Sequence, residues 1–322
     1  MRHFARKVGQ VKRIVIALGG NALGNTSEEQ LERVRITAEA VVEIVKAGYE
    51  VVVCHGNGPQ VGMINLAFEK GHEAGIVPEM HLPECTAMSQ GYIGYHLQQA
   101  IDQELVKNQI QDTVVITMLT QVIVDEKDPA FKNPTKPIGR YYDEAEAGRL
   151  MAETGQMYAE DSGRGYRRVV ASPQPVSIYE RISLNTLINA HHVVIAGGGG
   201  GIPVVKEPDG SYHGVAAVVD KDLAAEKLAE LVNADAFVIL TAVDKVSIRF
   251  GKPDQEDLSQ ITLSQAEQYI KEGHFAAGSM LPKVKAAMKF IEQKKEGVSI
   301  ICSLEKAAEA LSGKTGTRIV NK

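Results

Sequence analysis

Short runs of apolar, β-branched residues recur along the chain and alternate with longer stretches of helical periodicity. Six runs predict strands over 13–18, 50–55, 113–119, 192–196, 236–241 and 298–302. None of them alternates strictly between apolar and polar residues, which is typical of strands buried on both faces. The alternation of strands with helices therefore predicts a mainly parallel sheet with crossover helices on both faces.

The segments between these runs place apolar residues on one face of a helix. The pattern over 28–47 is the broadest, and Gly48 supplies a stop signal. The same spacing predicts further helices over 60–69, 86–107, 221–233, 263–271, 282–295 and 304–311.

The alternation of predicted strands and helices stops between Val124 and Ser177. A proline-rich polar segment covers 128–137, a short helix is predicted over 143–154, and a polar stretch follows at 161–168. The break predicts an insertion at the edge of the sheet that acts as a mobile lid or subdomain, although an ordinary surface excursion fits the same residues.

Three loops share one design, in which an apolar run ends at glycines that are expected to precede a helix. They cover 16–23, 55–60 and 196–203. Glycine lets the bare backbone approach a ligand, and free amides at a helix start attract anions. One such loop is compatible with an ordinary turn, but three favour a site for an anionic, phosphorylated small molecule.

Two lysines stand at predicted helix starts, where a cation opposes the helix dipole. Lys221 lies between Asp220 and Asp222, and Lys283 follows Pro282, which suits the first helical position. Capping explains Asp220 but does not explain the lysines. Either lysine alone fits a solvated surface; together they indicate positive charge around one anion, as phosphoryl transfer requires. A neighbouring aspartate would orient an ammonium group and keep it charged.

Composition narrows the classes of partner. With 322 residues, a net charge of -5 and no basic block, the chain does not resemble a nucleic-acid-binding protein. No apolar stretch reaches the roughly 20 residues of a membrane span, and glycines interrupt the first apolar run too early for a signal peptide. Three widely spaced cysteines (Cys54, Cys85 and Cys302) favour a reducing compartment over a disulfide framework or zinc site. These features predict a cytoplasmic protein.

Other catalytic chemistries lack support in the sequence. Ser89 and Ser172 are not in a nucleophile elbow, and His191 and His192 would point to opposite faces of a strand. The Walker phosphate loop is absent. The glycine run at 197–201 matches the dinucleotide fingerprint weakly, because Pro203 would disturb the helix start, so a nicotinamide-dependent dehydrogenase is disfavoured.

Several motifs together resemble those of the carbamate kinases in the amino acid kinase family, over essentially the whole chain. The most specific are Asn-Pro-Thr-Lys-Pro at 133–137 and Gly-Ser-Met-Leu-Pro-Lys-Val at 278–284. The others cover 17–23, 56–62, 128–131, 167–173, 196–203, 220–222 and 240–246. The motif at 17–23 alone would indicate only the wider family.

The resemblance implies a three-layer αβα sandwich around a mainly parallel sheet, with a small protruding subdomain. It implies one domain over 1–322, with an acceptor lobe at about 1–205, a subdomain at about 125–177 and a nucleotide lobe at about 206–322. It also implies a homodimer in arginine metabolism. The implied reaction is reversible transfer between ATP and carbamate, run in the cell toward ATP, with Mg²⁺ carried by the nucleotide.

The resemblance also assigns roles to residues of this chain, and none of them is expected to bind a metal. Lys221 and Lys283 would neutralise the moving phosphoryl group, Asp222 would hold them, and Lys136 would reach over the acceptor site. Substrate would contact Gly19, Gly20, Asn21, Gly56, Asn57, Gly58, Gly198 and Gly199. Nucleotide would contact Thr241, Asp244, Lys245, Met280 and Pro282.

One position departs from the wider family. Acetylglutamate kinases and their relatives carry a lysine two residues before the first Gly-Gly pair, whereas this chain has Ala17. The difference favours the carbamate kinases, in which Lys136 or Lys221 would supply the charge. The alternatives are a kinase of an amino-acid carboxylate and a ligand sensor without turnover; the second is disfavoured by the intact lysines.

Overall fold

An eight-stranded sheet is the centre of the protein, whose computed structural model describes residues 12–19, 23–24, 26–161 and 163–322. Its strand order is β15-β17-β16-β12-β1-β2-β9-β3, and only the β16–β17 pair is antiparallel. The strands are β1 (Arg13–Leu18), β2 (Glu50–His55), β3 (Val115–Thr117), β9 (Val193–Ile195), β12 (Ala236–Thr241), β15 (Gln260–Thr262), β16 (Val298–Ser303) and β17 (Thr317–Val320). The predicted parallel sheet is confirmed.

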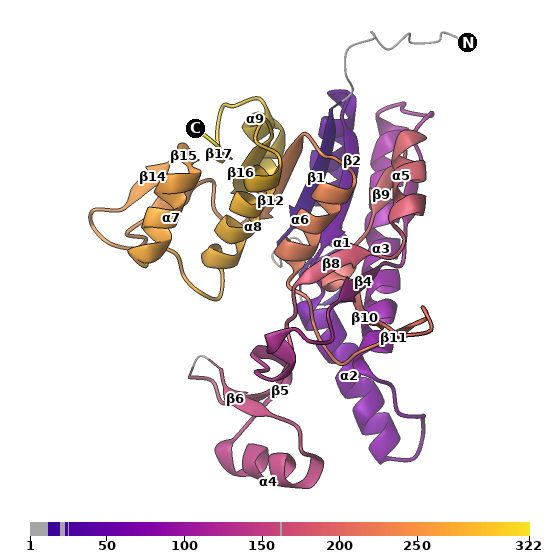
Figure 1. The fold of residues 1–322 in the computed structure, drawn as a ribbon. Helices are drawn as coiled ribbons and strands as arrows, with labels where there is room; N and C mark the ends of the chain where they lie inside the picture. The colour runs from indigo at the N-terminus through magenta and orange to yellow at the C-terminus, as the bar shows by residue number, and fades with distance from the viewer. Residues whose placement is uncertain (1–11, 20–22, 25, 162) are drawn as a thin grey trace.

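Helices cover both faces of this sheet, as Figure 1 shows. Side chains alternate along β1, so Val15 and Ala17 pack toward one helical layer while Ile14, Ile16 and Leu18 pack toward the other. The first layer contains α5 (Arg181–Asn189), α6 (Lys221–Leu231), α7 (Leu263–Lys271) and α8 (Met280–Gln293). The second contains α1 (Ser27–Lys46), α3 (Leu82–Lys107) and α9 (Ala307–Leu311). The expected αβα sandwich is therefore confirmed.

The segment between Val124 and Ser177, where the alternation of strands and helices stops, forms a subdomain of its own. A three-stranded antiparallel sheet contains β5 (Lys136–Tyr142), β6 (Tyr158–Glu160) and β7 (Tyr166–Val170), and α4 (Glu144–Thr154) packs on it. Figure 1 shows this unit projecting below the main body, next to α2 (Gly58–Glu73).

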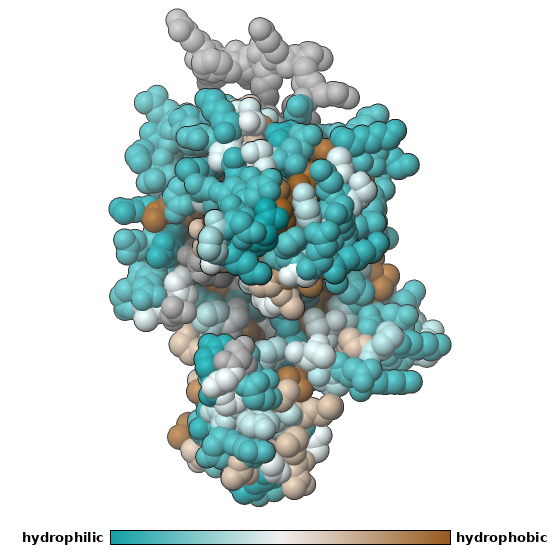
Figure 2. Space-filling view, turned by 90° about the vertical axis from the view of Figure 1, so that its left-hand side faces the viewer, coloured by the Kyte–Doolittle hydropathy of each residue, from teal (hydrophilic) through white to brown (hydrophobic). Residues whose placement is uncertain are grey.

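Figure 2 shows one face of the molecule as mostly hydrophilic, with scattered hydrophobic residues.

Two smaller sheets lie outside the central sheet and the subdomain. A four-stranded sheet has the order β11-β10-β4-β8, and a two-stranded hairpin pairs β13 with β14. Their bounds are β4 (Gln121–Val124), β8 (Pro175–Ile178), β10 (Ile202–Lys206), β11 (Tyr212–Gly214), β13 (Val246–Ile248) and β14 (Glu256–Leu258). Short 3-10 helices lie at Pro129–Phe131, Gly198–Gly200 and Leu304–Lys306. The sequence patterns predicted none of these strands.

The third glycine loop corrects one expectation. After the turn at Gly198–Gly200 the chain enters β10 and not a helix. Gly197, Gly199, Gly200 and Gly201 have φ values of 69°, 68°, 92° and 84°, which a right-handed helix start does not allow. The second loop behaves as predicted, because α2 begins at Gly58.

Helix α5 and strands β15 and β17 were not predicted, and several element boundaries also differ. The strand predicted over 113–119 is reduced to Val115–Thr117, and the helix predicted over 304–311 divides into a 3-10 turn and α9. Helix α8 starts at Met280, so Pro282 is its third residue and not its first. Residues near an element end are the hardest to assign from local pattern alone.

Candidate active site

Three charged side chains meet where α6 begins. Lys221 Nζ lies 2.6 Å from Asp222 Oδ1, and Lys283 Nζ, from the first turn of α8, lies 3.0 Å from Asp222 Oδ2. The lysine side chains are only 14% and 16% exposed, and that of Asp222 is 4% exposed. The fold thus brings both predicted lysines onto one carboxylate; Lys221, Asp222 and Lys283 are called the triad below.

The start of α6 places the triad. Asp220 is the N-cap, and its Oδ1 accepts a hydrogen bond of 2.9 Å from the backbone N–H of Asp222, as predicted. Its Oδ2 accepts a hydrogen bond of 3.2 Å from Lys136 Nζ in the subdomain. Asp220 therefore anchors α6 and also holds Lys136 beside the triad.

The charge state of Asp222 follows from its surroundings. Burial disfavours the carboxylate, but the ammonium groups of Lys221 and Lys283 outweigh burial and lower the pKa of Asp222 below its ordinary value. The carboxylate consequently stays ionised and neutralises one of the two cations. A positive charge in excess remains for a ligand anion.

A cavity of about 630 Å³ opens on the Lys221 side of the triad and is called the loop cavity. Residues Gly56, Asn57 and Gly58 line it where β2 gives way to α2, and Gly199 contributes from the third glycine loop. Lys136 and Lys221 also line it. Two glycine loops and two of the predicted lysines therefore share one cavity.

The close packing of the third loop against Asn57 requires glycine. A Cβ atom on Gly199 would lie 2.1 Å from Asn57 Nδ2, a distance that no side chain tolerates. Gly198, also predicted to contact substrate, does not line the loop cavity. A Cβ atom there would lie 2.4 Å from His55 Nε2, so Gly198 packs on the histidine beneath the cavity.

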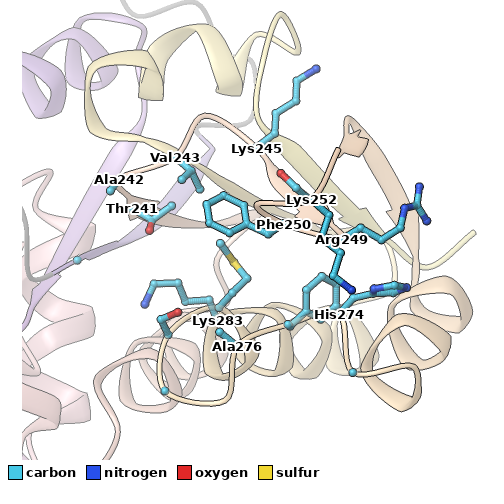
Figure 3. Close-up of a pocket in the computed structure, with 17 residues that line it drawn as sticks. Thr241, Ala242, Val243, Lys245, Arg249, Phe250, Lys252, His274, Ala276 and Lys283 are labelled. Carbon is cyan, nitrogen blue, oxygen red and sulfur yellow. The ribbon is translucent and has the colours of Figure 1, made fainter. Parts of the chain in front are cut away.

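A second cavity of about 680 Å³ lies on the Lys283 side, between the β13–β14 hairpin and the start of α8 (Figure 3). It is called the hairpin cavity. Among its lining residues are Gly19, Thr241, Lys245, Met280 and Lys283, all of which the resemblance assigned to substrate, nucleotide or catalysis.

Two predicted nucleotide contacts do not line the hairpin cavity. Pro282 is not among its lining residues. Asp244 faces elsewhere, because it accepts a hydrogen bond of 2.6 Å from Ser303 Oγ and forms an ion pair with Lys306. Two further predicted residues, Gly20 and Asn21, lie outside the described part of the chain.

An exposed aromatic ring enters the hairpin cavity. Phe250 is 68% exposed, and its ring points into the cavity toward Val243, whereas Arg249 points away (Figure 3). Arg249 has a φ of 54° and donates from Nε to Asp254 O at 2.8 Å, which fixes the tip of the hairpin. An unpacked ring held in a cavity offers a flat apolar surface to a ligand.

Two buried side chains below the glycine loops, the base His55 and the nucleophile Cys54, do not compete with the lysines for a chemical role. His55 ends β2 and contacts Gly56 O through Nδ1 at 2.7 Å; burial lowers its pKa to about 4, so its ring is neutral near pH 7. Burial raises the pKa of the Cys54 thiol to about 12. Both side chains support the loop from below.

The subdomain adds two cations that the sequence patterns did not single out as site residues. Arg140 and Arg167 line the loop cavity together with Lys221, and Arg167 Nε donates to Gly139 O at 3.1 Å. The pairing of β5 with β7 brings them together, and no motif spacing signals such a pairing.

The triad separates the two cavities and belongs to both. Lys221 lines the loop cavity, Lys283 lines the hairpin cavity, and Asp222 holds the two ammonium groups from between them. An anionic group that moves from a ligand in one cavity to a ligand in the other would pass this pair of cations. The geometry is that of a phosphoryl-transfer site.

The model of the amino acid kinase family matches residues 12–302, and the chain belongs to that family. Relatives of high identity within the family include several carbamate kinases, so the resemblance expected from the motifs is confirmed.

Three comparisons illustrate this similarity. The chain is 53% identical to a carbamate kinase of Staphylococcus haemolyticus, over 96% of this chain and 99% of the relative. It is 51% identical to a carbamate kinase of Pyrococcus furiosus, with the same coverage. A solved carbamate kinase from Giardia lamblia bound to AMP-PNP is 47% identical, with a TM-score of 0.89 over 96% of this chain and 98% of that one.

Proposed function

We propose that the protein transfers a phosphoryl group reversibly between ATP and carbamate, giving ADP and carbamoyl phosphate. The observation that carries the proposal is the triad, whose two ammonium groups are held on one carboxylate between two cavities. High identity to carbamate kinases over almost the whole chain supports the choice of acceptor. The same identity does not favour an amino-acid carboxylate as the acceptor.

The chemistry needs positioning and charge neutralisation more than proton transfer. Carbamate is already an anion, and its oxygen can attack the terminal phosphorus directly. The barrier is the approach of two negatively charged reactants, which Lys221 and Lys283 would lower by neutralising the moving group. Asp222 would keep both lysines in place, and Lys136 would add charge from the subdomain side.

We assign the nucleotide to the hairpin cavity and carbamate to the loop cavity. Thr241, Lys245 and Met280 would then contact nucleotide, and the glycine loops would contact the acceptor. The two lobes would divide at about residues 205–206, and the subdomain at about 125–177 would cover the acceptor. A complex of the Giardia relative with AMP-PNP supports nucleotide binding by this fold.

Mg²⁺ is assigned to the nucleotide phosphates. Within the described ranges no group of three or more His, Cys, Asp or Glu side chains could hold a metal ion. Both oxygens of Asp222 already face lysines. The ion would offset phosphate charge when it enters with the nucleotide, while the lysines act on the transferred group.

A homodimer in the cytoplasm, active in arginine metabolism and running toward ATP, completes the proposal. None of the helices in the described part of the chain is long and apolar enough to cross a bilayer. Light scattering after size exclusion tests the dimer.

The decisive experiment supplies carbamoyl phosphate and ADP, with and without Mg²⁺, and measures ATP by a coupled assay. We expect rapid, Mg²⁺-dependent ATP formation. N-acetylglutamate with ATP serves as the competing acceptor. Turnover of N-acetylglutamate without ATP formation from carbamoyl phosphate would replace the proposed function with that of an amino-acid kinase.

A further inference from the structure

A chain of three polar groups runs from the loop cavity into α3. Asn57 Nδ2 lies 2.8 Å from Ser89 Oγ, and Ser89 Oγ lies 2.7 Å from the backbone oxygen of Thr86. Ser89 is completely buried, and Asn57 is 7% exposed. The Ser89 hydroxyl therefore cannot exchange its partners for water.

The direction of these hydrogen bonds determines how the Asn57 amide is oriented. The Thr86 carbonyl can only accept, so the single hydroxyl hydrogen of Ser89 is donated to it. Ser89 then has only acceptor capacity left for Asn57. The amide nitrogen of Asn57 faces Ser89 and donates to this acceptor.

The remaining atom of the amide, Asn57 Oδ1, is left for the loop cavity, which Asn57 lines. No residue of the described chain donates a hydrogen bond to it. Among the described residues, the fully buried side-chain atoms without a hydrogen-bond partner do not include Asn57 Oδ1. Since no described residue donates to it either, Oδ1 is accessible to a ligand in the cavity. A buried acceptor that opens onto a cavity calls for a donor on the ligand.

This acceptor stands out because its neighbours are donors. Lys221, Lys136 and Arg167 surround the same cavity, and together they suit the oxygens of a small anion. A ligand that carries both a carboxylate and an N–H group satisfies both kinds of partner at once. A ligand with a methyl group in place of the amino group would leave Asn57 Oδ1 unpaired, which is costly in a buried site.

We propose that Ser89 is a positioning residue that fixes Asn57 so that Oδ1 accepts a hydrogen bond from the amino group of the acceptor substrate. This interaction selects carbamate over its methyl analogue, acetate. The inference rests on the proposed function, since it concerns the acceptor of that reaction.

The test compares two phosphoryl donors that differ only in this group. ATP formation from ADP is measured with carbamoyl phosphate and with acetyl phosphate, for the wild type and for Ser89→Ala. We expect Ser89→Ala to lower the preference for carbamoyl phosphate, as the ratio of kcat/KM values, by about three- to tenfold, the range for one neutral hydrogen bond. The KM for ADP should not change.

Two control variants separate this role from a structural one. Ser89→Thr keeps the hydroxyl and should retain the wild-type preference. Thr37→Ala removes another buried hydroxyl that donates to a helix carbonyl, Arg33 O at 3.1 Å on α1, and should leave the ratio unchanged. An unchanged ratio in Ser89→Ala, whether both activities fall equally or neither falls, overturns the proposal. A wild type inactive with carbamoyl phosphate would instead refute the proposed function, and this inference with it.

Discussion

Lys283 donates a hydrogen bond of 3.0 Å to Asp222 across the contact between α8 and α6, from a position 61 residues away in the chain. The other oxygen of the same carboxylate holds Lys221. Because Lys221 and Lys283 line different cavities, this carboxylate sets the distance between the cation on the acceptor side and the cation on the nucleotide side. Displacing either lysine should impair transfer more than binding.

Lys221→Ala should fold normally and transfer the phosphoryl group about 10²- to 10³-fold more slowly, the usual loss when one well-placed donor to a developing charge is removed. Asp222 would keep Lys283 as its partner, so a buried unpaired carboxylate is not created. A coupled ATP-formation assay measures kcat. Lys70→Ala, which removes an exposed lysine on α2, is the control. Turnover of Lys221→Ala near that of the control would remove Lys221 from the catalytic set.

Lys136→Ala should separate activity from stability. Its ion pair with Asp220 is partly exposed, at 36% for the lysine, so its loss should change the free energy of unfolding by less than about 1 kcal/mol. The kcat/KM for carbamoyl phosphate should fall at least about tenfold, because a cation facing the acceptor is lost. Urea unfolding and steady-state kinetics measure the two effects. A large loss of stability with unchanged kcat/KM would assign Lys136 a purely structural role.

Phe250→Ala should weaken nucleotide binding and leave the chemical step intact. The ring offers a stacking surface inside the hairpin cavity, and loss of an aromatic contact of this kind would raise the KM for ADP about five- to tenfold. The kcat at saturating ADP should stay the same. Tyr179→Ala, which removes a half-exposed ring outside the cavity, is the matched control. An unaltered KM for ADP in Phe250→Ala would show that the nucleobase of ADP does not stack on this ring.

Glu226→Gln should show how much the buried carboxylate of Glu226, one turn after the triad on α6, lowers the free energy of unfolding. Glu226 is fully buried; Lys289 Nζ lies 2.9 Å from Oε2, yet neither oxygen has a well-directed hydrogen bond within the described structure. Burial raises the pKa of Glu226 above its ordinary value, although Lys289 opposes the shift. The folded state therefore binds a proton more readily than the unfolded state does.

The sign of the pH effect follows from this difference. Wild-type stability should fall, relative to Glu226→Gln, as the pH rises from the ordinary value of 4.5 through the raised pKa. At pH 8 the variant should be as stable as the wild type or more stable by about 1 kcal/mol. Urea unfolding at pH 4.5, 6 and 8 measures the trend. A wild type that gains stability over the variant with rising pH would contradict it.

Three of the buried central strands could be predicted to the residue. The predicted bounds of β1, β2 and β12 agree with the structure, because strands covered on both faces must be continuous apolar runs and end abruptly at the polar edge. Strands β4, β8, β10 and β11 escaped prediction. They have three to five residues each, too few for a periodic signal, and β4 pairs with strands that lie far away in the chain.

By itself, then, the sequence determined the parallel sheet, the second glycine loop at the start of α2 and the unusual lysines at two helix starts, since each depends on neighbours within a few residues. Only the tertiary structure decided that Lys283 and Lys221 meet on Asp222, that Lys136 reaches Asp220 from 84 residues away, and that Ser89 orients Asn57. It also directed Asp244 toward Lys306 and away from the hairpin cavity. These contacts join residues whose distance in space is set by the packing of helices on the sheet, and local periodicity carries no information about that packing.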